Sequence, residues 1–182
     1  MPSRDPDTTG APPRRLIVLA AVLAVTFAAA VALVALFAPT AQPPVTGTLT
    51  VPWAPAPQAN SPECSALLSA LPPELVSKGA KLTRRELTQP APPATMAWGE
   101  PDPIVLRCGV ERPLELTPTT QLRVVSGVQW LPVEGEGRST WYVVDRAVYV
   151  ALTVPDSAGT GPLQQTSDAV AATLPTVPLR FD

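Results

Sequence analysis

Histidine is missing from this chain of 182 residues, and the absence excludes whole classes of chemistry. Without histidine there is no His-assisted nucleophilic triad and no His-ligated metal site. The sequence also contains no Gly-x-Ser-x-Gly, Ser-x-x-Lys, Walker or EF-hand motif. We therefore predict no catalytic residues, no metal site and no cofactor.

Charged residues are also scarce, at 15% of the chain against about a quarter in an ordinary soluble protein. The formal net charge of −2 excludes the basic surface on which nucleic-acid binding depends, so we expect no nucleic-acid partner. Proline, by contrast, occurs 25 times, and 46% of the residues are hydrophobic. This composition indicates an apolar segment and a Pro-rich segment in addition to a folded domain.

An uncharged run of 22 residues from Leu16 to Phe37 follows Arg14 and Arg15. As a helix this run would span about 33 Å, enough to cross a hydrocarbon core of about 30 Å. Because the basic residues precede the run, the positive-inside rule predicts a cytoplasmic N-terminus. We expect a cytoplasmic tail over residues 1–15 and a transmembrane anchor over 16–38 that holds the protein in the cell membrane.

Two other interpretations of the apolar run compete with a retained anchor. A cleaved signal peptide has an apolar region of about 7 to 15 residues, which this run exceeds, and Pro39 interrupts the small residues that would form a cleavage site. A buried helix of a soluble protein would have a polar face, and this run has none. We therefore favour a retained anchor, and whether the N-terminal segment is cleaved stays open.

Residues 39–60 are rich in proline and contain no charged residue. This composition disfavours helix and sheet and favours extended, polyproline-like chain. We interpret the segment as a linker between the anchor and a domain. The alternating residues Leu49, Val51 and Trp53 allow for an edge strand within it.

Residues 61–182 are numerous enough to bury a single hydrophobic core. Ser61 and Pro62 indicate the start of a short helix that ends before Pro72, and residues 162–174 have the period of a second helix. Apolar runs rich in β-branched residues predict antiparallel strands at 104–110, 127–133, 140–144 and 147–154. We therefore expect an extracytoplasmic α+β domain, a small antiparallel sheet with helices at the domain ends, preceded by one transmembrane helix.

Both cysteines, Cys64 and Cys108, fall in the region that the anchor places outside the cytoplasm, where disulfides form and persist. Two cysteines without histidine offer too few ligands for a structural zinc ion, and the Cys-x-x-Cys spacing of thiol oxidoreductases is missing. We predict a disulfide between them. For a loop of about 45 residues, chain entropy gives about 4 kcal/mol of stabilisation.

Candidate chemistry rests on scattered polar residues. Glu100 and Asp102 could supply a general acid and base, although carboxylates beside prolines are more often loop surface. The Gly-Thr-Gly sequence at 159–161 precedes a predicted helix, where amides can bind an anion, but we favour a Gly-rich turn at a helix start. The polar stretch 78–89 is interpreted as a loop or an edge strand.

Four residues surround the entry to the strand that carries the second cysteine, namely Trp98, Gly99, Pro101 and Arg107. A Trp-Gly step between prolines is unsuited to a regular strand, so we predict a rigid, irregular rim. Such a rim with an aromatic residue and an arginine suits recognition of a partner. The alternative is that Trp98 fills the core while Arg107 pairs with a nearby carboxylate.

Residues 97–101 (Ala-Trp-Gly-x-Pro) and 105–109 (Val-Leu-Arg-Cys-Gly), behind an apolar anchor and a Pro-rich spacer, resemble an actinobacterial family. Its members are uncharacterised, membrane-anchored secreted proteins catalogued as a domain of unknown function. The resemblance covers most of residues 60–175. It implies a cell-envelope protein and the cysteine pair, and it implies no activity.

We therefore expect a single-pass envelope protein whose non-catalytic extracytoplasmic domain binds or scaffolds another envelope protein or a wall component. The alternative is a hydrolase or transferase that acts on cell-wall precursors through carboxylates. A deep cleft with perturbed carboxylates would indicate the enzyme, and a shallow apolar patch would indicate the binding module.

Overall fold

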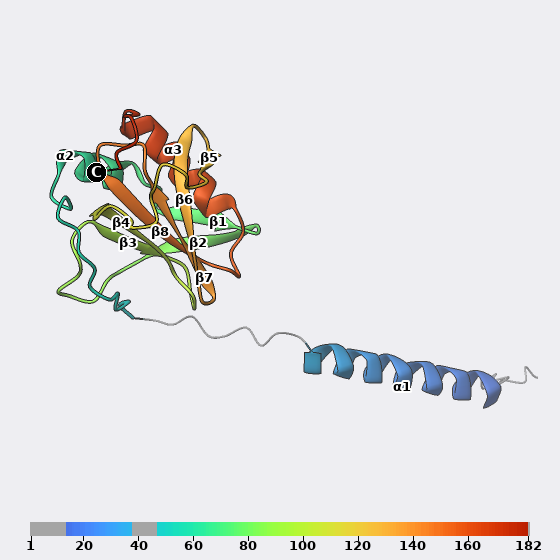
Figure 1. Ribbon diagram of the computed structural model, residues 1–182. Helices are drawn as coiled ribbons and strands as arrows, with labels where there is room; N and C mark the ends of the chain where they lie inside the picture. The colour runs from blue at the N-terminus through green and yellow to red at the C-terminus, as the bar shows by residue number, and fades with distance from the viewer. Residues whose placement is uncertain (1–13, 38–46, 182) are drawn as a thin grey trace, which may run out of the picture. The chain divides into compact units, whose positions relative to one another are not determined.

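The N-terminal part of the chain forms one helix, α1 (Arg14–Phe37), in the computed structural model (Figure 1). The structure describes residues 14–37 and 47–181, and within α1 it describes the side chains of residues 15–30. In this described part, none of the helices has the length and hydropathy that a membrane span requires. The anchor predicted over 16–38 extends beyond the described side chains, and most of the predicted tail lies outside the described residues.

The chain from Pro44 onward forms a second unit, which combines helices and strands. Its helices are α2 (Pro62–Ala70) and α3 (Gly161–Thr173). Its strands are β1 (Glu74–Ser77), β2 (Ala80–Arg85), β3 (Thr95–Trp98), β4 (Ile104–Val110), β5 (Arg123–Val125), β6 (Val128–Gly135), β7 (Arg138–Val143) and β8 (Tyr149–Pro155). These elements confirm the predicted α+β class.

The strands of the described chain form one sheet in the order β1-β2-β3-β4-β8-β7-β6-β5, and all neighbours are antiparallel. The predicted meander is confirmed in β6 to β8, and β5, which was not among the predicted strands, extends it at one edge. The polar stretch 78–89 differs from expectation, because its strand β2 lies inside the sheet. The four-residue strand β1, which has no clear sequence signature, pairs outside it.

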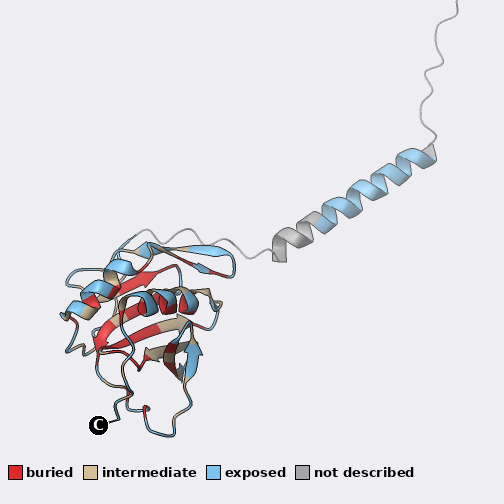
Figure 2. Ribbon diagram, turned by 90° about the horizontal axis from the view of Figure 1, so that it is seen from above, coloured by how far each residue is buried: buried red, intermediate tan, exposed pale blue. Residues whose placement is uncertain are grey.

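Alternate side chains divide the sheet into an inner and an outer face. On the inner face, Ile104, Leu106 and Cys108 of β4 belong to the larger core, which also includes residues of α2 and α3. Arg107 points to the outer face by the same alternation. The outer face carries a smaller apolar cluster that includes Tyr149. Figure 2 shows the buried residues gathered on the strands and on the helix sides that face them.

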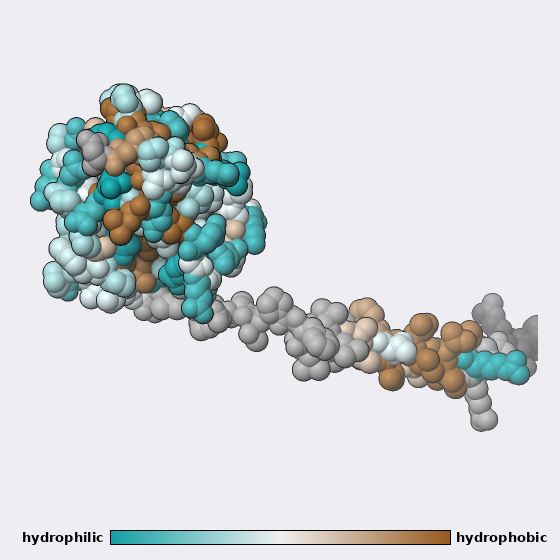
Figure 3. Space-filling view, viewed as in Figure 1, coloured by the Kyte–Doolittle hydropathy of each residue, from teal (hydrophilic) through white to brown (hydrophobic). Residues whose placement is uncertain are grey.

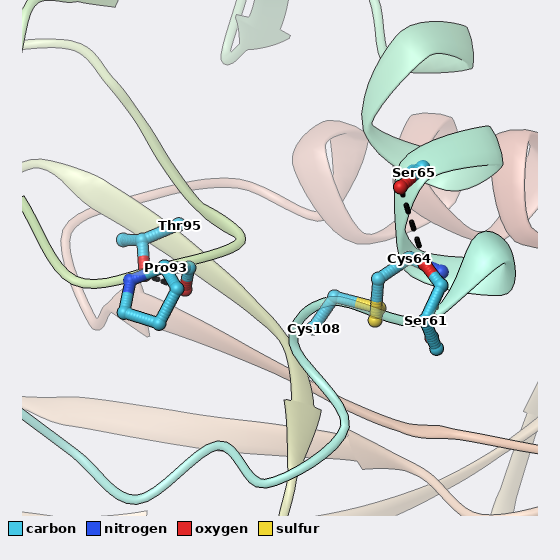
Figure 4. Close-up of a disulfide and its surroundings, with 6 residues drawn as sticks. All are labelled: Ser61, Cys64, Ser65, Pro93, Thr95 and Cys108. Carbon is cyan, nitrogen blue, oxygen red and sulfur yellow. Dashed lines mark hydrogen bonds between the residues drawn. A yellow bond between two sulfur atoms is a disulfide. The ribbon is translucent and has the colours of Figure 1, made fainter.

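Helix α2 begins as predicted at Ser61, whose hydroxyl accepts a hydrogen bond from the Cys64 amide at 3.2 Å. The helix buries Cys64 and Leu67 against the sheet. Cys64 is joined to Cys108 of β4, so the predicted disulfide is confirmed (Figure 4). The bond fastens α2 to the middle of the sheet across a sequence separation of 44 residues.

Helix α3 contacts β1 at one edge of the sheet and β5 and β6 at the other, so the sheet must curve around it. Near the start of α3, the Gln165 side chain pairs with the backbone of Val76 in β1. Its Nε2 donates to the Val76 carbonyl at 3.2 Å, and the Val76 amide donates to its Oε1 at 3.3 Å. A side chain thus takes the place of a neighbouring strand at this edge.

Residues 47–60, which we call the strap, run along the outside of the domain before α2 begins (Figure 1). Leu49 forms a parallel bridge with Leu87, and the Gln58 amide donates to the Gly109 carbonyl at 3.0 Å. The strap therefore belongs to the folded unit, whereas we had expected the linker to continue to residue 60. Hydrogen bonds to distant backbone, rather than its own composition, hold it in place. The earlier linker residues lie outside the described part.

A buried ion pair closes the connection between β7 and β8. Arg146 Nη1 lies 2.8 Å from Asp145 Oδ1, and both side chains are almost fully buried. Asp145 Oδ2 also accepts the Gln129 amide at 3.1 Å. Because these charges neutralise each other, we assign the pair a structural role.

Candidate functional site

A hollow of about 330 Å³ opens on the outer face of the sheet. Its floor is formed by strands β4, β8 and β7, on which Arg107, Ala151 and Tyr142 are aligned in one row by the strand register. Thr153 and Thr140 form the next row, and both line the hollow. Because the small Ala151 lies between two long side chains, it leaves space between Arg107 and Tyr142. We call this feature the outer hollow.

The walls of the outer hollow come from two segments without regular structure. The strap contributes Ala54 and Pro55, and the chain after β4 contributes residues 111–115, next to Val110 at the end of that strand. Within this second segment, the Leu114 side chain is 86% exposed. Trp53, beside the lining residue Ala54, is 72% exposed. Large apolar side chains therefore stand beside a polar floor.

Arg107 is a charged residue of the outer hollow whose hydrogen-bonding capacity is only partly used. Its Nη2 donates to the Pro52 carbonyl at 3.1 Å, whereas its buried Nε has no hydrogen-bond partner. None of the ion pairs found among the described residues involves Arg107. Burial lowers the pKa of the Arg107 guanidinium, and Tyr142 partly offsets this effect. A guanidinium without a carboxylate partner is suited to bind an anion.

Hydroxyl groups and a carboxylate complete the polar lining. The Thr140 and Thr153 hydroxyls lie 3.1 Å apart and form a hydrogen bond across β7 and β8. The pKa of the Tyr142 phenol is raised, mainly by burial and then by the negative charge of Glu115. The positive charge of Arg107 lowers this pKa and so offsets part of the rise. The site therefore presents both donors and acceptors to a ligand.

The ionisation of Tyr142 tests this arrangement. Because the folded-state pKa of Tyr142 is raised, its contribution to stability is complete below the unfolded pKa of about 10 and is lost as pH rises through the folded value. We expect ultraviolet titration of phenolate absorbance to show one late-ionising tyrosine that Tyr142→Phe removes. Arg107→Gln should raise the pKa of Tyr142 further. An unchanged titration in Arg107→Gln would contradict the proximity of the two groups.

The predicted recognition residues do not form one surface. Trp98 is fully buried on the inner face and donates from Nε1 to the Pro72 carbonyl at 3.1 Å. Trp98 ends the regular strand β3, so its inclusion in the irregular rim is wrong, whereas residues 99–103 between β3 and β4 have no regular structure. Gly99 is also buried and Pro101 is exposed, whereas Arg107 lies on the opposite face from Trp98. Contact of any of them with a partner stays a prediction.

The carboxylates considered for catalysis line a different hollow of about 250 Å³. Glu100 pairs with Arg85 at 2.7 Å, not with Arg107 as the alternative interpretation of the sequence proposed. Asp102 is exposed. In the Gly-Thr-Gly turn, the Gly159 amide donates to the Ser77 hydroxyl at 2.8 Å, so this amide already has a protein partner.

Sequence reasoning identified Arg107 but missed Tyr142, Thr140 and Thr153. Thr140 and Tyr142 have the alternating spacing of one strand face, and this signal could have placed them together. Their alignment with Arg107 depends on the pairing of β4, β7 and β8, which the alternation alone does not give.

Comparison with models of protein families identifies the family of this chain. A family model described as "Protein of unknown function (DUF3515)" matches residues 21–179, which is most of the chain. No curated protein matches the chain, and no solved structure does.

Proposed function

The chain belongs to the DUF3515 family of proteins of unknown function, and we propose that it is a membrane-anchored, non-catalytic binding module of the cell envelope. In this proposal α1 is the anchor, the second unit lies outside the cytoplasm, and the outer hollow contacts an envelope protein or a wall component. The actinobacterial source that the sequence motifs imply is part of the same proposal.

The character of α1 supports membrane attachment. The finding that no described helix meets the criterion for a span covers only residues 15–30 of α1, whereas the whole helix of 24 residues corresponds to about 36 Å, against a hydrocarbon core of about 30 Å. The described apolar side chains are exposed, including Leu19, Leu23 and Phe27, and Figure 3 shows hydrophobic residues along the helix. A helix with so much exposed apolar surface needs lipid or another protein to cover it. The Cys64–Cys108 disulfide favours an oxidising compartment for the domain.

The observation that carries the binding role is the uncompensated charge of Arg107 in the outer hollow. Desolvation of a cation costs free energy that an ordinary structural arginine recovers from a carboxylate. Arg107 makes a hydrogen bond to a carbonyl and no ion pair within the described chain. A bound partner with anionic groups would supply the missing compensation.

Site-specific photo-cross-linking in intact cells tests this function. A photoreactive residue that replaces Leu114, on the wall of the outer hollow, should cross-link the full-length protein to its binding partner and give one discrete adduct. Val124, which is 69% exposed on β5 and does not line the outer hollow, is the matched control and should give none.

Four results would contradict the proposal. Equal adducts from both positions, or none from Leu114, would exclude the outer hollow as the binding surface. A C-terminal reporter that is active only in the cytoplasm would exclude the proposed topology. A mature protein that begins near Gln42 would exclude a retained anchor.

A further inference from the structure

The charges around the outer hollow restrict the kind of ligand that it can hold. Arg107 and Arg112 contribute two positive charges, and Glu111 and Glu115 contribute two negative charges. Both arginines donate to a backbone carbonyl, Arg112 from Nη1 to Leu116 at 2.9 Å and Arg107 from Nη2 to Pro52 at 3.1 Å, but the Arg107 Nε has no hydrogen-bond partner. One anionic group beside Arg107 is therefore favoured, and a second negative charge would meet the glutamates.

The remaining polar groups favour a ligand with several hydroxyls. Thr140, Thr153 and Tyr142 present hydroxyls that both donate and accept hydrogen bonds. Glu115 accepts hydrogen bonds, and its charge acts on the Tyr142 phenol, so the two groups lie close enough to interact. A hydroxylated ring can bond to such a mixed lining, whereas a hydrocarbon cannot.

The size and the apolar part of the lining favour a single ring. A volume of about 330 Å³ lies at the lower end of the range for ligand pockets, about 300 to 1,000 Å³. Ala54, Pro55, Val110 and Ala151 provide apolar surface beside the polar groups. Sugar rings combine apolar C–H faces with hydroxyl edges, and this combination matches the lining.

We propose that the outer hollow binds a sugar acid, with its carboxylate on Arg107 and its ring hydroxyls on the side chains of Tyr142 and Glu115. This assignment rests on the proposed function, because it takes the outer hollow as the binding surface. It adds the chemical class of the ligand. A carboxylate carries one charge and fits the two oxygens of its planar group to the guanidinium fork.

Three probes that share a pyranose ring test the class: D-glucuronate, D-glucose and D-glucose 6-phosphate. They would be titrated into the ¹⁵N-labelled full-length protein in detergent micelles, with amide shifts recorded by nuclear magnetic resonance. Glucuronate should shift the amides of residues 107, 140 and 142 saturably, with a dissociation constant of about 1 mM, as suits one small ring. Glucose should bind at least about tenfold more weakly because it lacks the charge.

Variants at matched positions separate the carboxylate contact from general charge effects. Arg107→Gln should weaken glucuronate binding at least about tenfold, and Arg107→Lys should weaken it less, because lysine keeps the charge without the fork. Arg84→Gln removes the same charge from an exposed position of β2 and should leave binding unchanged.

The outcomes distinguish this inference from the proposed function. Glucose binding as tightly as glucuronate, tighter binding of glucose 6-phosphate, or no shifts with any probe would overturn the sugar-acid assignment. Equal weakening by Arg84→Gln and Arg107→Gln would overturn it as well. The cross-linking result at Leu114 judges the binding surface independently of the ligand class.

Discussion

Replacing Gly109 by alanine should cost about 5 kcal/mol or more, which approaches the whole stability of a small domain. Gly109 has a φ of +76°, and a Cβ atom there would lie 2.3 Å from the Gln58 carbonyl carbon and 2.4 Å from the Ala59 nitrogen. A left-handed conformation costs an alanine about 1 to 2 kcal/mol. The overlap with backbone adds to this, because it is relieved only if the strap moves away from β4. Chemical denaturation of the full-length protein in detergent would measure the loss.

Gly137 provides the matched control for this substitution. Its φ of +69° imposes the same backbone cost, but a Cβ atom would meet nothing within 4 Å. Gly137→Ala should therefore cost only about 1 kcal/mol. Equal stability of the two variants would show that position 109 does not need glycine for the close packing of the strap.

Trp98→Ala should lower the free energy of unfolding by about 3 to 5 kcal/mol. The indole is fully buried among the inner-face residues, and its removal leaves a cavity and an unpaired Pro72 carbonyl. Denaturant titration followed by fluorescence measures the change, since three other tryptophans remain.

Trp53→Ala removes the same side chain from a position where it is 72% exposed. Its cost should stay within about 0.5 kcal/mol, as for ordinary surface substitutions. A small loss for Trp98→Ala, comparable to that for Trp53→Ala, would return Trp98 to the group of candidate recognition residues.

Local signals predicted much of the fold. The Ser61 and Pro62 pair identified the start of α2, and the apolar, β-branched runs between 127 and 154 predicted the strands of the meander. The disulfide was predicted because the chain has two cysteines, in a region expected to lie outside the cytoplasm, and neither has another predicted partner. Each of these inferences needs only neighbouring residues or a simple count.

Features that depend on distant segments were not predictable in the same way. The sequence of the strap predicts a linker because its proline content disfavours regular structure. Its amides and carbonyls nevertheless form hydrogen bonds to residues about forty to fifty positions away. Trp98 and Arg107 are close in sequence but lie on opposite faces, because a turn and the strand register intervene. The candidate site therefore required the pairing of β4, β7 and β8.

The Gln165 contact with Val76 also bears on aggregation. An exposed edge strand is a template on which another chain can add a strand, and β1 is one edge of this sheet. The glutamine amide occupies one amide and one carbonyl of that template, and the opposite edge, β5, is only three residues long and carries Arg123. If the protein is anchored in a membrane as proposed, many copies in one membrane would otherwise bring such edges together at high local concentration. The sheet is thus protected at both ends from growing into a fibril.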